Sequence, residues 1–86
     1  MIPKQREDVI CREEDFGAII FDPKAGRMHK LNIDGYLIWT LCDGDRDVDT
    51  IAETLAQKEG EDVEEVKEKV DAFLKDMDER QLIRWL

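Results

Sequence analysis

Few residues of this chain have the types and the spacing that catalysis or metal binding requires. His29 is the only histidine, and a general base would need a nucleophile or a substrate site beside it, which the sequence does not supply. Cys11 and Cys42 form no CxxC pair and no His/Cys cluster, so we expect two reduced thiols and no zinc site. The chain has no serine, no Walker loop and no Gly-x-Gly-x-x-Gly motif. We therefore expect no enzyme activity and no cofactor.

The charged residues indicate the kind of partner. The chain has 22 Asp and Glu against 13 Lys and Arg, a formal net charge of -9. Such a surface repels phosphate backbones, so we expect no nucleic-acid partner and favour a basic or mixed-charge protein or peptide. Four aspartates occupy alternate positions of one stretch: Asp43, Asp45, Asp47 and Asp49. The glycine and the terminal glutamate that a calcium loop requires are not in register with them. We interpret them as turn formers and helix caps and expect no metal site.

Length and hydropathy set the class of protein. The 86 residues are predicted to form one small domain, and the 42% hydrophobic content favours a folded core over disorder. No apolar run approaches the roughly 20 residues that span a membrane, and the N-terminus has no signal-peptide core. We expect a cytoplasmic protein without membrane association, with a single domain at residues 1–86 in which residues 1–7 are a loose lead-in.

The first third of the chain is predicted to be sheet. Residues that favour strands occur at 8–12, 16–21 and 27–31 and predict three antiparallel strands. Between the last two, the run from Asp22 to Gly26 matches a type I turn closed by a left-handed glycine. The strand at 27–31 is short and polar, which is typical of a sheet edge that avoids aggregation and also of one that accepts a partner strand.

The rest of the chain is predicted to be helical. Asn32 and Asp47 are good N-caps for helices at 33–42 and 48–58, which a tight Asp-Gly turn joins into a helix-turn-helix unit. A third helix over residues 63–80 carries one apolar stripe at steps of three and four: Val63, Val66, Val70, Phe73, Leu74 and Met77. Residues 81–86 either pack on the core or add a last short strand. The predicted fold is α+β and winged helix-turn-helix-like, with a three-stranded antiparallel sheet followed by three helices.

The charge of the third helix separates two functions that this fold could serve. In DNA-binding winged helices the third helix enters the major groove and carries Arg and Lys. Here residues 61–81 hold nine acidic side chains and four basic ones, so a winged-helix transcription regulator is a disfavoured alternative. A structural or oligomerisation subunit of a larger complex is a second alternative.

The order and spacing of several short motifs resemble the PqqD family. These are Leu31-Asn32 at the start of the first helix, Ile38-Trp39 within it, Asp43-Gly44 after it, Val48 and residues 51–55 in the second helix, and Gln81-Leu82-Ile83 after the third. The D-P-x-x-G-R turn also fits. The match covers roughly residues 9–83.

The resemblance implies a RiPP recognition element, a small domain that binds the leader part of a ribosomally made precursor peptide. It also implies a partner enzyme that modifies the peptide, often a radical SAM enzyme. The leader would add as a strand to the edge of the sheet and lie against the third helix, a recognition mode in which the main chain supplies affinity and side chains supply selectivity. The expected peptide-binding residues are Arg27, Met28, His29, Lys30 and Leu31 on the strand, and Lys67, Val70, Asp71 and Leu74 on the helix.

Two points of this site stay open in the sequence. Either Met28 or His29 faces the ligand, because alternate residues of a strand point to opposite sides. Val70 and Leu74 either form an apolar pocket for the leader or pack in the core.

Overall fold

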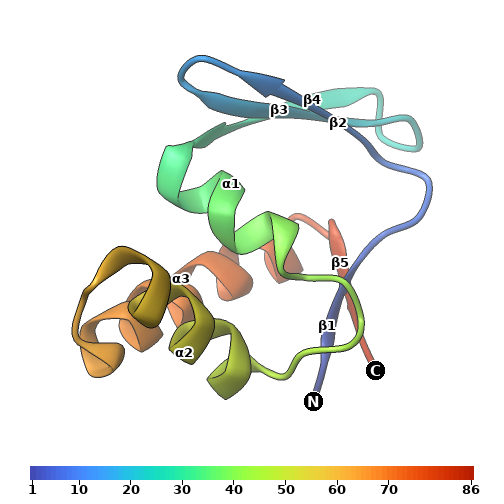
Figure 1. The fold of residues 1–86 in the computed structure, drawn as a ribbon. Coiled ribbons are helices and arrows are strands. Elements are labelled where there is room, and N and C mark those ends of the chain that lie inside the picture. The colour runs from blue at the N-terminus through green and yellow to red at the C-terminus, as the bar shows by residue number, and fades with distance from the viewer.

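The computed structural model describes residues 1–86, and its strands form two sheets. The elements, in chain order, are β1 (Pro3–Gln5), β2 (Ile10–Glu14), β3 (Gly17–Asp22), β4 (Arg27–Asn32), α1 (Ile33–Thr40), α2 (Val48–Glu59), α3 (Val63–Glu79) and β5 (Ile83–Trp85). One sheet has the order β2-β3-β4 and the other pairs β1 with β5, all antiparallel. Figure 1 shows that the helices lie on one side of the three-stranded sheet and leave its other face uncovered. The predicted fold, a three-stranded antiparallel sheet followed by three helices, is confirmed.

The prediction of a loose lead-in at residues 1–7 is wrong. Residues 3–5 form strand β1, which pairs with β5 in the register Pro3 with Trp85 and Gln5 with Ile83. The partner strand lies about 80 residues further along the chain, so no local pattern could reveal it. For the C-terminal segment both alternatives hold, because Leu82 and Ile83 are buried and the strand forms as well.

The local signals for turns and caps act largely as predicted. Asn32 Oδ1 accepts a hydrogen bond from the Gly35 N–H at 2.7 Å at the start of α1, and Asp47 Oδ1 accepts one from the Thr50 N–H at 2.8 Å at the start of α2. The first strand begins at residue 10 rather than 8, because a turn at residues 6–9 precedes it. Asp62 precedes α3 as expected, but its side chain makes no capping hydrogen bond.

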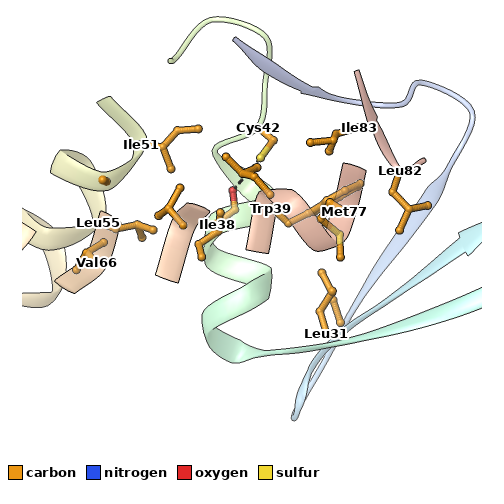
Figure 2. Packing of buried hydrophobic residues seen from close by; sticks show 14 of the residues in the cluster. Leu31, Ile38, Trp39, Cys42, Ile51, Leu55, Val66, Met77, Leu82 and Ile83 are labelled. Atoms are coloured by element: carbon orange, nitrogen blue, oxygen red, sulfur yellow. Dashed lines mark hydrogen bonds between the residues drawn. The ribbon is translucent and has the colours of Figure 1, made fainter. Parts of the chain in front are cut away.

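The core forms where α1 lies between the sheet and the other two helices. Trp39 of α1 is 1% exposed, and side chains from α2, α3 and β5 converge around it (Figure 2). Helix α3 contributes its apolar stripe, with Val70 at 0% and Leu74 at 2% exposed. No buried side-chain nitrogen or oxygen lacks a hydrogen-bond partner.

One nearly buried ion pair joins three parts of the chain. Arg6, which follows β1, places its Nη2 atom 2.6 Å from Asp22 Oδ1 at the end of β3. Its Nη1 atom also donates to the carbonyl of Gln81, just after α3, at 2.9 Å. Asp22 is 4% exposed and also accepts hydrogen bonds from the backbone N–H groups of Lys24 and Ala25 in the turn before β4. This ion pair therefore fixes the distance between the β3–β4 hairpin and the end of α3.

We expect Leu74→Ala to reduce the free energy of unfolding by about 2–5 kcal/mol, because the change leaves a cavity in the core. Lys75→Ala, at the exposed neighbouring position, is the control and should change it by less than about 0.5 kcal/mol. Urea unfolding followed by circular dichroism measures both. A loss below about 0.5 kcal/mol for Leu74→Ala would show that this side chain does not contribute to the core.

We expect Asp22→Asn to lower the Tm at neutral pH, because the Arg6 guanidinium loses the buried one of its two carboxylate partners and keeps only the more exposed Asp8. The side-chain hydrogen bond from Arg6 lowers the pKa of Asp22 from its ordinary 3.8 to about 2. The ionised carboxylate therefore stabilises the folded protein at pH values above 3.8. That stabilisation disappears as the pH falls from 3.8 to about 2.

Thermal melts of the native protein and of Asp22→Asn should accordingly differ at pH 7 and converge in this acid range. Asp15→Asn, at an exposed position, serves as the control. A difference in Tm that stays constant down to the lowest pH would contradict this role of the carboxylate.

Candidate functional site

Strand β4 has an open edge. β3 lies in the middle of the sheet, so β4 pairs with β3 on one side and with no strand on the other. An edge strand presents unpaired N–H and C=O groups that can pair with another chain. The prediction that this strand lies at a sheet edge is therefore confirmed.

The sheet has a second open edge at β2, whose chemistry differs. Glu13 and Glu14 lie on β2 and Asp15 follows it, and these three carboxylates line a shallow hollow with Tyr36 and Leu37 of α1. β4 instead carries Arg27, His29 and Lys30. The two edges therefore differ in charge. A side chain of the β4 edge, His29, also contacts α3.

The structure decides which of Met28 and His29 faces the helices. His29 pairs in register with Ile20, which is fully buried, and its ring Nδ1 lies 3.2 Å from Arg80 Nη1 at the end of α3. Met28 is 68% exposed and points to the uncovered face of the sheet, as Lys30 does. A peptide placed between β4 and α3 would therefore meet His29 and not the Met28 side chain.

His29 and Arg80 form a defined polar contact across this edge. Burial and the positive charge of Arg80 lower the pKa of His29 below its ordinary 6.5, so the ring is neutral at pH 7. Arginine can only donate, so Nδ1 of the neutral ring accepts and Nε2 carries the proton. Arg80 in turn donates from Nε to Asp76 Oδ1 at 2.9 Å, one helical turn earlier.

Phe73 extends the same side of α3 toward the start of α1. A Cβ atom added at Gly35 would lie only 3.1 Å from Phe73 Cε1, so the ring packs closely on the backbone there. Phe73 is half-buried. Helix α3 thus presents Phe73, Asp76 and Arg80 toward β4 and the beginning of α1.

The four helix residues expected in the site do not form one surface. Val70 and Leu74 are buried, so of the two open interpretations the structure supports core packing, and the expected apolar pocket is not formed. Lys67 Nζ forms an ion pair with Asp49 of α2 at 2.8 Å. With Asp71 it lines a hollow against the start of α2 and Trp85 of β5. On a helix of 3.6 residues per turn, this side is opposite to that of Asp76 and Arg80.

Sequence reasoning missed Phe73, Asp76 and Arg80 as site residues. A signal was present, because these residues follow one another at steps of three and four, and an Asp-Arg pair at i and i+4 marks an exposed helix side. The sequence alone does not say which side of an amphipathic helix turns toward a given strand.

Other kinds of site find no support in the structure. No group of three or more His, Cys, Asp or Glu side chains could hold a metal ion. The two cysteines are not bonded to each other: Cys11 is exposed, and burial raises the pKa of the Cys42 thiol to about 12. No helix combines the length and the apolar character needed to cross a membrane.

The chain is thus an α+β domain in which an edge strand of a three-stranded antiparallel sheet contacts the end of the third helix. Residues 17–83 match the family model described as coenzyme PQQ synthesis protein D (PqqD). This match spans more than half of the chain, and the chain therefore belongs to the PqqD family. The resemblance found in the sequence is confirmed.

Solved structures with the same fold have low sequence identity. TbiB1 in complex with the TbiA(beta) leader peptide has a TM-score of 0.83 at 18% identity, with 96% of each chain covered. The PqqD truncation of Methylobacterium extorquens PqqCD, described as a RiPP recognition element, has a TM-score of 0.81 at 19% identity, covering 98% of this chain and 89% of that one. Lasso peptide synthetase B1 complexed with the leader peptide has a TM-score of 0.83 at 15% identity, covering 99% and 100%. No curated protein matches the chain.

We expect the stability of the protein to fall on mild acidification because of His29. Its pKa is lower in the folded state, so the unfolded state binds the proton more readily below the ordinary 6.5. The free energy of unfolding should therefore decrease more steeply in the native protein than in His29→Gln between about pH 7.5 and 5.5. Parallel pH curves for the two proteins would show that His29 does not titrate in this way.

Proposed function

We propose that this protein is a non-catalytic RiPP recognition element that binds the leader segment of a precursor peptide along β4. It then presents the peptide to a modifying enzyme, such as a radical SAM enzyme. The observation that carries the proposal is the open edge of β4 beside the exposed side of α3. Two further findings support the proposal: the chain belongs to the PqqD family, and it shares its fold with structures that hold leader peptides. Residues 1–86 act as a single peptide-binding domain.

Main-chain pairing supplies the sequence-independent part of the affinity. A leader in extended conformation adds a fourth strand to the sheet and pairs with those N–H and C=O groups of Arg27 through Leu31 that point away from β3, which alternate residues of the strand supply. The open edge is ordered by β3 before the peptide arrives, so the main cost of binding is the ordering of the leader. This geometry explains how a small domain without a deep cavity holds a flexible peptide.

Side chains between β4 and α3 supply selectivity. His29, Asp76 and Arg80 offer hydrogen-bond donors and acceptors, and Phe73 offers an aromatic surface. A leader carboxylate would compete with Asp76 for the Arg80 guanidinium, and a leader aromatic or aliphatic side chain would pack on Phe73. Val70 and Leu74 act from inside the core, where they hold α3 at its position.

The chemistry at the edge supports the role of a presenter rather than a catalyst. The neutral His29 is hydrogen-bonded through Nδ1 to the Arg80 guanidinium, which is not a nucleophile. The modification reaction is therefore assigned to the partner enzyme.

We expect Lys30→Pro to weaken leader binding more than it weakens folding, because proline removes one backbone donor from β4. Lys30→Ala is the matched control, since it removes the same side chain and keeps the N–H. Titration with a synthetic leader of the cognate precursor gives the affinities, and urea unfolding gives the stabilities. If both variants bind the leader like the native protein, the main chain of β4 is not the site.

Amide NMR shifts during the same titration locate the peptide. Shifts should centre on residues 27–31 and on Phe73, Asp76 and Arg80. Shifts centred on residues 43–55, with β4 silent, would contradict the proposed site.

A further inference from the structure

The uncovered face of the three-stranded sheet is apolar and nearly free of carboxylates. The registers place its outward residues in three rows across β2, β3 and β4: Ile10-Phe21-Met28, Arg12-Ile19-Lys30 and Glu14-Gly17-Asn32. We call these nine residues, together with Phe16 beside them, the outer face. One row is wholly apolar, and the next is an isoleucine between two cations.

Three apolar side chains of the outer face are open to solvent, whereas Ile19 and Phe21 are half-buried. Met28 is 68% and Ile10 62% exposed, and Phe16 is 41% exposed. Phe16, Ile19, Met28 and Lys30, together with His29 of the same strand, line a shallow hollow. Figure 1 shows that no helix covers this side of the sheet. Exposed apolar rows on an otherwise strongly charged small protein indicate a surface that contacts another protein.

Charge distinguishes the outer face from the rest of the molecule. It carries two cations and one carboxylate, in a chain whose formal net charge is -9. Glu14 binds Arg12, whereas Lys30 forms no ion pair and lies 4.5 Å from the centre of the Phe16 ring. A partner with carboxylates around an apolar centre is therefore repelled over most of this protein and attracted here.

The outer face also adjoins the proposed leader site. Met28 and Lys30 direct their side chains to the outer face while their main chain belongs to the β4 edge. A protein docked on the outer face would lie beside a leader paired with β4 without covering that edge. Presentation of a bound peptide requires this arrangement, in which two partners are held at once on adjoining surfaces.

From these observations we propose that the outer face docks the peptide-modifying enzyme, through an enzyme surface of exposed apolar side chains bordered by carboxylates. This inference rests on the proposed function. Three strands at about 4.8 Å and alternate residues along them give an area of roughly 10 Å by 13 Å between Cα positions. An interface confined to a patch of this size is small, so the docking is transient. Two copies of a chain of charge -9 would repel each other, which disfavours a homodimer here.

The test compares two exposed isoleucines that receive the same charge. Ile10→Glu lies on the outer face, at the strand farthest from the leader edge, and Ile33→Glu lies on α1, where Ile33 is 56% exposed. The probes are the purified enzyme that modifies the cognate precursor and a synthetic leader of that precursor. Enzyme affinity is measured by biolayer interferometry with and without leader, and leader affinity by fluorescence titration.

We expect Ile10→Glu to weaken enzyme binding about ten-fold or more and Ile33→Glu to leave it unchanged, because only the first places a charged carboxylate in the apolar row of the outer face, near the carboxylates of the partner. Both variants should bind the leader normally. Arg12→Glu is a second outer-face variant, used if circular dichroism shows that Ile10→Glu does not fold.

Equal enzyme affinity of the native protein and the outer-face variants, or no enzyme binding by the native protein, would overturn the docking inference. An equal loss for Ile33→Glu would do the same, since it would indicate general charge repulsion. A native homodimer that Ile10→Glu dissociates in analytical ultracentrifugation would assign the face to a second copy. If the native protein binds the enzyme through this face but does not bind the leader at all, the proposed function fails and the docking inference stands.

Discussion

The ion pair between Arg6 and Asp22 connects the segment after β1, the β3–β4 hairpin and the end of α3. Its two ends lie after β1 and at the end of β3, and Arg6 also binds the carbonyl of Gln81 after α3. Both charges are largely removed from water, so the pair depends on its hydrogen bonds being complete, which the turn N–H groups of Lys24 and Ala25 help to achieve. Because the β3–β4 hairpin and the end of α3 meet at this point, the spacing between the open edge and the helix follows from it.

The sheet has a different role on each of its sides. Its inner face carries Ala18, Ile20 and Leu31, which are buried against α1 and the core. Its free edge at β4 offers main-chain groups, and its outer face offers apolar and basic side chains. A strand alternates its side chains between faces and its hydrogen bonds between edges, so a few residues of β4 can serve three surfaces. Because of this alternation, a chain of 86 residues can have a core and still expose more than one surface.

The fold is shared with solved structures at 15 to 19% identity, and the physical reason is visible in this chain. Strand and helix periodicity, two side-chain caps and a short list of buried apolar residues define the architecture, and many different residues satisfy each of them. The acidic surface of α3 departs from the basic surface that a winged helix needs for DNA, although the architecture is the same. The architecture of this chain therefore does not determine the chemistry of its surface.

The sequence by itself determined the elements whose causes are local. The three strands, the turn at residues 22–26, the caps Asn32 and Asp47 and the amphipathic α3 all follow from neighbouring residues, so the fold class and the edge position of β4 could be predicted. Tertiary structure alone decided what depends on residues far apart in the chain. The pairing of β1 with β5 joins its two ends, the Arg6–Asp22 ion pair joins segments 16 residues apart, and the rotation of α3 determines that Arg80, and not Lys67, meets β4. Helical periodicity defines an apolar stripe but not which flank of the stripe faces a given strand, because that rotation is set by how all the elements pack around Trp39.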